Sequence, residues 1–279
     1  MRVAAIDCGT NSIRLLIADV VGDELVDVVR TMRIVRLGEG VDRTGQFAEQ
    51  ALARTFAACQ EYAELISDHQ PVLTRFVATS ASRDVSNRQE FVDGVYRALG
   101  VLPDVISGDQ EARLSFLGAT ADIVGSQDRP APPYLVVDIG GGSTEFVLGT
   151  QEPTAARSVD IGCVRMTERH LRSDPPTPEQ IVAATADIDA AIELAATVVP
   201  LAQANTLIGL AGSVTTVAAL ALELDHYDPS RIHASHIRAD VVHDITQRLL
   251  HMTREQRAVL APMHEGRIDV IGAGALVLD

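Results

Sequence analysis

The chain of 279 residues contains no lysine, so all 23 of its basic residues are arginines. This absence excludes a P-loop nucleotide site, which needs a lysine on the β- and γ-phosphates. Arginine can still bind phosphate oxygens through two parallel hydrogen bonds. The composition therefore excludes one class of phosphate site without excluding phosphate chemistry.

Cysteine is scarce, and long apolar runs are missing. Cys8, Cys59 and Cys163 are far apart and match no zinc pattern, which predicts reduced thiols rather than a disulfide framework. Every apolar run is shorter than the roughly 18 residues that a membrane helix needs. The N-terminus lacks the basic region and cleavage site of a signal peptide. We therefore expect a cytoplasmic protein that does not interact with membranes.

The net charge of −15 disfavours nucleic acid as a partner. It does not disfavour a phosphate substrate, because a few local arginines can outweigh the global field. With 47% hydrophobic residues, the chain can form one large core or two domains.

Two glycine-rich loops repeat each other. Asp7-Cys8-Gly9-Thr10-Asn11-Ser12 and Asp138-Ile139-Gly140-Gly141-Gly142-Ser143 both follow apolar runs, at an offset of 131 residues (138 − 7). Each unit predicts a strand, a tight turn and a second strand. Glycines let backbone N–H groups approach an anion, and an aspartate at a strand end can hold a metal ion. The repeat indicates two similar domains.

Strand and helix patterns alternate in both halves, which predicts an α/β fold. The loop-rich segment 125–133 marks the boundary between an N-terminal domain, 1–125, and a C-terminal domain, 126–279. Capping-box patterns at Ser86, Ser107 and Thr177 predict three helix starts. A polar loop is expected over 79–84, and the small residues of 269–276 predict a helix crossing or hinge.

Three carboxylates are candidates for chemistry. Glu111 lies in the first turn of a predicted helix, where a carboxylate can deprotonate a water or simply complement the helix dipole. Asp138 and Glu145 flank the second glycine loop, although spacing does not fix which way they face. If they line a phosphate site, a divalent cation must lie between them and the substrate. The alternative is a capping aspartate and a solvent-facing glutamate.

Arg14 and Arg83 are the cationic candidates. Arg14 holds the position in the first hairpin that Glu145 holds in the second, and Arg83 follows a run of hydroxyl and small residues. Each could instead be a solvated surface arginine. The histidines of the last third match no metal motif, so we expect them on the surface or in helix packing.

Six segments together resemble the exopolyphosphatase/guanosine pentaphosphate phosphohydrolase family, of the actin, Hsp70 and sugar-kinase superfamily. In chain order they are Asp7–Arg14, Thr79–Arg83, Ile106–Leu114, Val137–Glu145, Gly209–Ser213 and Asp269–Leu276. The resemblance implies two ribonuclease-H-like (actin-like ATPase) domains with an interdomain cleft. It also implies that an activated water, assisted by Mg2+, releases a terminal phosphate.

The resemblance assigns roles by position. It implies that Glu111 is the general base, and that Asp138 and Glu145 are catalytic carboxylates that hold the metal ion and organise the water. The substrate-binding residues that it implies are Asn11, Ser12, Arg14, Arg83, Gly140, Gly141, Gly142, Ser143, Gly212 and Ser213.

Two departures from the family pattern bear on activity. Gln110 stands where the family commonly has a glutamate, and the chain stops soon after Leu276. Longer relatives carry additional C-terminal helical domains, so we expect short polyphosphate chains as substrate. Polyphosphate and pppGpp both stay open, as does a homodimer. A small-molecule kinase and a non-catalytic phosphate sensor are the alternative functions.

Overall fold

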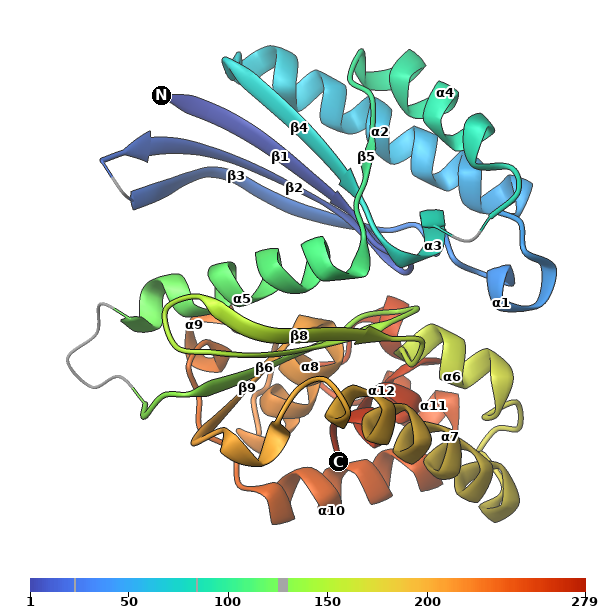
Figure 1. Ribbon diagram of the computed structural model, residues 1–279. Coiled ribbons are helices and arrows are strands. Elements are labelled where there is room, and N and C mark those ends of the chain that lie inside the picture. Colours follow the sequence, from blue (N-terminus) through green and yellow to red (C-terminus); the bar gives the residue numbers. More distant parts are fainter. Residues whose placement is uncertain (23, 84, 125–129) are drawn as a thin grey trace. The chain divides into compact units, whose positions relative to one another are not determined.

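The computed structural model describes residues 1–22, 24–83, 85–124 and 130–279 (Figure 1). The chain forms two compact units, Met1–Ser107 and Gly108–Asp279. The sequence-based boundary between residues 125 and 126 lies outside the described residues. The division falls earlier in the chain because the helix that follows Ser107 packs against the second sheet.

The first unit is a five-stranded sheet in the order β3-β2-β1-β4-β5. Its strands are β1 Arg2–Cys8, β2 Ser12–Val21, β3 Glu24–Ile34, β4 Leu73–Ala78 and β5 Asp104–Val105. Its helices are α1 Val41–Thr44, α2 Glu49–His69, α3 Ser80–Arg83 and α4 Arg88–Leu99. The first three strands form the predicted meander, and β4 runs parallel to β1.

The core of the first unit lies between this sheet and α2 and α4. Ile6 and Phe76 on the strands and Phe91 on α4 are fully buried there. Tyr62 of α2 donates a hydrogen bond of 2.9 Å to the carbonyl oxygen of Ile13. This contact fixes α2 against β2, one residue beyond the first glycine loop.

Two predictions for the first unit are wrong. The segment expected as a polar loop contains the short helix α3. Ser86 does not cap α4, because its hydroxyl donates instead to Gly45 and the helix begins with Asn87 as its N-cap. The side chain of Asn87 also makes no cap, since it bonds both backbone groups of Phe47. The side chains of Ser86 and Asn87 thus form tertiary hydrogen bonds instead of the capping bonds that the local sequence pattern predicted.

The second unit is a four-stranded sheet in the order β8-β7-β6-β9. Its strands are β6 Tyr134–Ile139, β7 Thr144–Gly149, β8 Pro153–Val159 and β9 Thr206–Leu210. Its helices are α5 Gly108–Val124, α6 Cys163–Arg169, α7 Pro178–Ala196, α8 Ala211–Ala221, α9 Pro229–Ile232, α10 Ala239–His251, α11 Arg254–Ala258 and α12 Ile271–Leu278, with 3-10 turns at Leu201–Gln203 and Glu265–Arg267.

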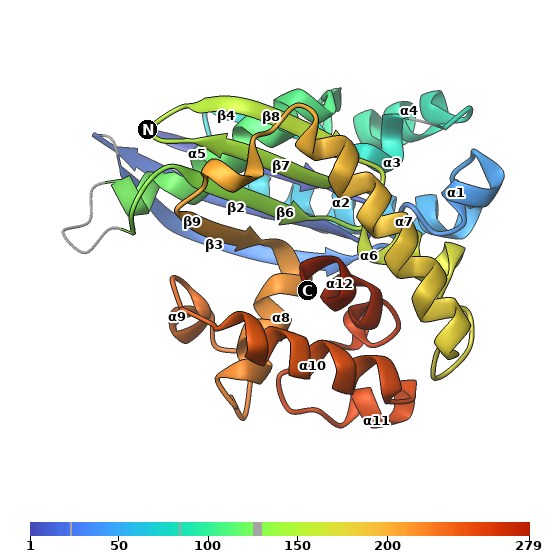
Figure 2. The same ribbon diagram turned by 60° about the horizontal axis from the view of Figure 1, so that its bottom comes forward.

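Two predictions for the second unit are confirmed. Thr177 accepts from the backbone N–H of Gln180, and the Gln180 side chain reciprocates, so α7 begins with a full capping box. The small residues near the C-terminus form α12, which packs against α6, α8 and α10 (Figure 2). A Cβ on Gly274 would lie 2.6 Å from the Cβ of Ser213, so this crossing requires glycine.

Strand alternation divides the second sheet into two faces. Tyr134, Val136 and Val147 pack against Ala112 and Phe116 of α5. Residues of the opposite parity, such as Leu135 and Phe146, belong to the core that includes α7 and α12. Helix α5 therefore covers one face of this sheet. Asp138 and Glu145 have the parity of Val136 and Val147, which places them on the α5 face.

The two sheets share one plan, which confirms the predicted α/β fold and its internal repeat. In each, an antiparallel three-strand meander is joined by a strand parallel to its first strand, β4 beside β1 and β9 beside β6. A helix connection precedes each parallel strand, as such a crossover requires.

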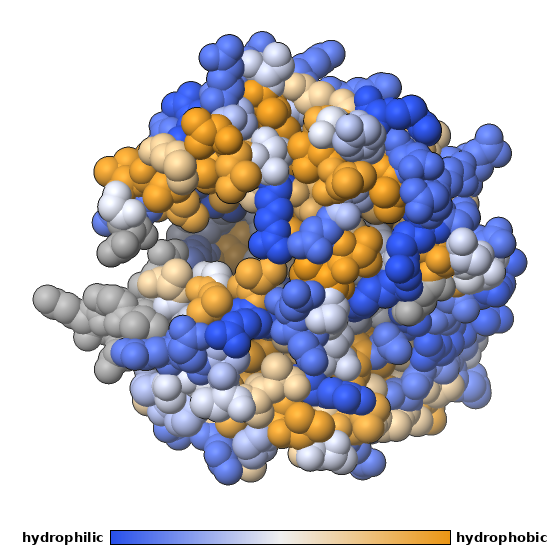
Figure 3. Space-filling model, turned by 45° about the horizontal axis from the view of Figure 1, so that its top comes forward, coloured by the Kyte–Doolittle hydropathy of each residue, from blue (hydrophilic) through white to orange (hydrophobic). Residues whose placement is uncertain are grey.

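Exposed apolar residues are distributed over the surface, and Figure 3 shows apolar areas broken by polar ones on one face. Several gather at the end of the first sheet away from the Gly9 loop: Met1, Val21, Leu25, Val26, Val72 and Leu73. Among the described residues, no helix is both long and apolar enough to cross a bilayer.

Candidate active site

The second hairpin brings two carboxylates face to face. Asp138 on β6 and Glu145 on β7 are direct partners in the antiparallel register. Side chains at such a pair lie on the same face of the sheet, with Cβ atoms about 5 Å apart. The register therefore settles what spacing alone leaves open, because both carboxylates point to the α5 face.

Glu145 is almost completely buried, with 1% of its surface exposed. One of its oxygens, Oε1, accepts hydrogen bonds from the hydroxyls of Ser143 at 2.8 Å and Ser158 at 2.7 Å. Burial raises the pKa of Glu145 well above its usual range, and the neighbouring Glu111 and Asp138 raise it further. The two serine donors act in the opposite direction but do not cancel the effect.

Helix α5 supplies the third carboxylate. Ser115 donates a hydrogen bond of 2.5 Å to Oδ2 of Asp138, which anchors the helix at the strand end. Glu111 lies one helical turn before Ser115 and hence on the same side of α5. Its charge acts on Glu145, so Glu111, Asp138 and Glu145 form one acidic cluster within the second unit.

The second glycine loop is held by its carbonyl groups. The carbonyl oxygens of Gly140 and Gly141 accept from backbone N–H groups at the start of α6. Among the described residues, none accepts a hydrogen bond from the N–H groups of Gly141, Gly142 or Ser143. A loop that fixes its carbonyls and keeps its N–H groups available has the form of an anion-binding turn.

Several residues that support this site were not predicted from the sequence. Arg165 on α6 donates from Nε to the carbonyl oxygen of Gly142 at 2.7 Å. A Cβ on Gly162 would lie 2.5 Å from the carbonyl carbon of Gly141, so glycine is required where α6 meets the loop. Ser115 could have been found from its spacing to Glu111. Ser158 and Arg165 could not, because only the strand register and the placement of α6 bring them to the site.

The first hairpin has the same turn with different chemistry. Gly9 donates from its N–H to the carbonyl of Ser12 at 3.0 Å, as Gly140 does to Ser143. Asn11 and Ser12 are both buried in this turn. Arg14 is the direct partner of Asp7 in the register, and the two form an ion pair of 3.1 Å in which each side chain is nearly half exposed.

Arg83 lies at the end of α3, partly buried, and donates to the carbonyl oxygen of Ile106 at 3.2 Å. The hydroxyls of Thr10 and Ser80 lie 3.0 Å apart, so α3 touches the first glycine loop. The first unit therefore places α3, which ends at Arg83, beside the loop that carries Asn11 and Ser12.

Gly212 and Ser213 begin α8, which follows the strand that pairs with β6. Ser213 is fully buried, because Gly274 of α12 packs on it. The guanidinium of Arg267 lies directly on Gly212, where a Cβ would overlap it. Ser213 is thus fully covered by other parts of the second unit, whereas Gly212 is half-buried.

The acidic cluster fits a divalent cation that the substrate helps to bind. Among the described residues, no group of three or more His, Cys, Asp or Glu side chains is arranged to hold a metal ion unaided. Mg2+ is commonly bound by one or two carboxylates together with substrate phosphates and waters. Asp138 and Glu145 could supply such a pair. Burial is the main cause of the raised pKa of Glu145, and a cation there would offset the added repulsion from Glu111 and Asp138.

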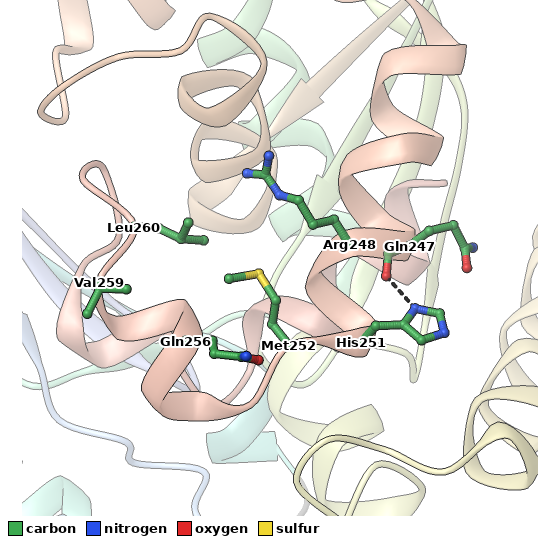
Figure 4. A pocket seen from close by; sticks show the side chains of 7 residues that line it. All are labelled: Gln247, Arg248, His251, Met252, Gln256, Val259 and Leu260. Carbon is green, nitrogen blue, oxygen red and sulfur yellow. Dashed lines mark hydrogen bonds between the residues drawn. The ribbon is translucent and has the colours of Figure 1, made fainter.

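A separate depression of about 640 Å³ lies between α10 and α11 (Figure 4). Its lining residues are Gln247, Arg248, His251, Met252, Gln256, Val259 and Leu260. His251 is bonded through Nδ1 to the carbonyl oxygen of Gln247 at 2.7 Å. None of the predicted site residues lines this depression. It is therefore a different place on the second unit from the acidic cluster.

Comparison with known proteins identifies the family. The model of the Ppx/GppA phosphatase family matches residues 16–279. Exopolyphosphatase 2 of Mycobacterium tuberculosis is 53% identical over all of this chain and 89% of its own length. An exopolyphosphatase-like protein of known structure superposes with a TM-score of 0.95 at 48% identity, over 100% of this chain and 87% of the other.

The Ppx/GppA enzyme of Aquifex aeolicus superposes with a TM-score of 0.80 at 32% identity, over 100% of this chain and 90% of that one. The sequence resemblance is thereby confirmed along the whole length of the molecule. This chain belongs to the Ppx/GppA phosphatase family.

Proposed function

We propose that the protein is an exopolyphosphatase, a phosphoanhydride hydrolase that releases terminal orthophosphate from inorganic polyphosphate. The observation that carries the proposal is the cluster of Glu111, Asp138 and Glu145 beside a glycine turn with available N–H groups. The similarity to Exopolyphosphatase 2 over the full chain supports the same reaction. The short-chain preference expected from the sequence stays a prediction, and so do cytoplasmic location and a homodimer.

Glu111 is assigned as the general base. It stands in the first turn of α5, where the helix dipole favours the ionised carboxylate. It removes a proton from water as the water oxygen bonds to the terminal phosphorus. The bridging P–O bond breaks, and the shortened polyphosphate leaves with that electron pair. A positioned base of this kind contributes about 10²–10⁴ in rate.

Asp138 and Glu145 are assigned to hold Mg2+ or another divalent cation. Their hydroxyl partners Ser115, Ser143 and Ser158 fix how the two carboxylates are turned. When bound, the cation neutralises charge on the phosphate oxygens and on the leaving group. The family relationship supports this need for a cation.

Phosphate binding is assigned to the loops and arginines. The N–H groups of the 140–143 turn suit phosphate oxygens, and Arg83 offers the planar fork that binds two of them. Asn11, Ser12 and Arg14 are assigned to the same task in the first unit. For Ser213, burial beneath α12 favours a role in supporting the fold over direct contact with substrate. Gly212 is only half-buried, and the guanidinium of Arg267 lies against it.

The test is a comparison of phosphate release from short polyphosphate, long polyphosphate, pppGpp and ATP, each with Mg2+. We expect polyphosphate to be hydrolysed with the highest kcat/KM, and the Glu111→Gln variant to lose most of its turnover on every substrate. A clear preference for pppGpp would replace polyphosphate as the substrate without changing the chemistry. Phosphate transfer from ATP to a small molecule would instead support the kinase alternative, and binding without turnover would support a sensor.

A further inference from the structure

We propose that Ser158 and Gly108 are positioning residues that set the separation of Glu111 and Glu145. The inference rests on the proposed function and adds two residues to it. Ser158 touches both carboxylate-bearing elements, since its hydroxyl binds Glu145 and its Cβ faces the start of α5. Neither residue reaches substrate in this scheme, and both act through the carboxylates.

The first contact is the hydrogen bond from Ser158 to Oε1 of Glu145. Ser143 donates to the same oxygen, so two hydroxyls, one from the glycine turn and one from β8, hold one end of the carboxylate. These two hydrogen bonds to Oε1 also fix the orientation of the other oxygen, Oε2. Ser158 lies directly opposite Glu145 in the β7–β8 register, which makes this contact a property of the sheet.

The second contact is the close approach of Gly108. A Cβ built on Gly108 would lie 2.6 Å from the Cβ of Ser158 and 3.0 Å from its hydroxyl. Apart from its chain neighbours and its own helix backbone, no other described atom would lie within 4 Å. Helix α5 can therefore begin at this distance from β8 only because residue 108 has no side chain.

The two contacts combine at Ser158. Glu111 follows Gly108 by three residues on the first turn of α5, so any outward shift of that turn moves its carboxylate. Where the turn does not shift, the added methyl group presses on Ser158 and hence on Glu145. Catalysis is sensitive to displacements of about 1 Å, so a single added methyl group at position 108 reaches both carboxylates.

The experiment is a double-mutant cycle on the intact chain, with kcat, KM and melting temperature measured for polyphosphate hydrolysis. Gly108→Ala is expected to lower kcat roughly tenfold or more with a much smaller change in KM. Ser158→Ala is expected to lower kcat roughly tenfold by removing a hydrogen bond to a charged group. Gly118→Ala on the same helix is the matched control, because a Cβ there meets nothing within 4 Å.

The cycle separates the two contacts. Ser158→Gly removes both atoms that a Cβ on Gly108 would meet, so adding Gly108→Ala to Ser158→Gly should cost little further activity. Ser158→Ala keeps its Cβ, so adding Gly108→Ala to that variant should still lower kcat about as much as in the wild type. Equal losses in all three backgrounds would overturn the proposal, and so would wild-type kcat in Gly108→Ala.

Amide hydrogen exchange over 108–116 gives a readout that does not depend on activity. Faster exchange is expected for Gly108→Ala and near wild-type exchange for Gly108→Ala combined with Ser158→Gly. If the wild type releases no phosphate from polyphosphate, the proposed function fails while the exchange data still test the Gly108–Ser158 contact. If the wild type is active and the cycle is additive, the proposed function stands and this inference fails.

Discussion

The two hairpins of this protein have the same backbone and opposite electrostatics. In the first, Asp7 faces Arg14, and the exposed pair is internally neutral. In the second, Asp138 faces Glu145, and the buried acid has a raised pKa. The equivalent position holds an arginine, Arg14, in the first hairpin and a glutamate, Glu145, in the second. This one difference in residue type replaces an ion pair by a pair of carboxylates. One backbone plan thus carries two kinds of charge, and the proposed function assigns phosphate binding to the first turn and cation-dependent catalysis to the second.

Removal of divalent cations should have the largest effect, because the proposed function places them beside the catalytic carboxylates of the second hairpin. EDTA should abolish phosphate release from polyphosphate, and excess Mg2+ should restore it. The reason is that Asp138 and Glu145 repel a polyanion unless a cation is present. Full activity in EDTA would leave the acidic cluster without its assigned role.

Matched substitutions at the two strand ends compare the hairpins directly. Asp138→Asn should lower kcat about a hundredfold or more, since a cation site supplies several kcal/mol of transition-state stabilisation. Asp7→Asn should change kcat only a few-fold, because Asp7 is paired with Arg14 in an exposed ion pair. Equal losses of kcat in the two variants would contradict the division of labour between the hairpins.

Arg83→Lys should raise KM for polyphosphate roughly tenfold while kcat stays within a few-fold of the wild type. Lysine keeps the charge but cannot make two parallel hydrogen bonds to phosphate oxygens, and a bond to a charged group is worth about 1.5–3 kcal/mol. Arg172→Lys, a change at an exposed arginine on the second unit, is the control. An unchanged KM in Arg83→Lys would reduce Arg83 to a structural residue.

Glu145→Gln should raise the thermal stability of the cation-free protein at neutral pH. Because the pKa of Glu145 is raised in the folded state, the folded protein binds this proton more tightly than the unfolded chain. Stability is therefore lost as pH rises from the ordinary glutamate value towards the raised one. The variant lacks this loss and should melt a few degrees higher in EDTA, as expected for a domain of this size.

The two proteins should melt alike at pH values below the ordinary glutamate pKa, where Glu145 is protonated in both states. Mg2+ should also raise the melting temperature of the wild type more than that of the variant, since a bound ligand stabilises the folded state. A lower melting temperature for Glu145→Gln at neutral pH in EDTA would show that the ionised carboxylate of Glu145 does not destabilise the folded protein.

Sequence patterns predicted the repeated hairpins and the α/β class because both depend on local alternation and on turn glycines. The Thr177 capping box was also predictable, since all of its partners lie within one helical turn. The Ser86 box failed because tertiary contacts claimed both Ser86 and Asn87. The assignment of α5 to the second unit was missed for a related reason. The loop-rich segment 125–133 shows where the regular sequence pattern stops, but it does not show which sheet the preceding helix packs against.

The candidate site was partly predictable. Glu111, Asp138 and Glu145 stood out through their motifs, and the structure brings them together on one face of the second sheet. Ser158 and Arg165 reach the site only through strand register and helix packing. Strand register and helix packing cannot be read from the spacing of neighbouring residues, so no sequence pattern could assign Ser158 and Arg165 to the site.

In the proposed mechanism Glu111 activates water while the remaining groups hold the cation and substrate. The most direct test measures single-turnover phosphate release and polyphosphate binding for Glu111→Gln in saturating Mg2+. The rate should be about 10²–10⁴ lower than that of the wild type. Binding affinity should stay within a few-fold of the wild-type value, and the melting temperature within a few degrees. A rate close to that of the wild type would contradict this mechanism.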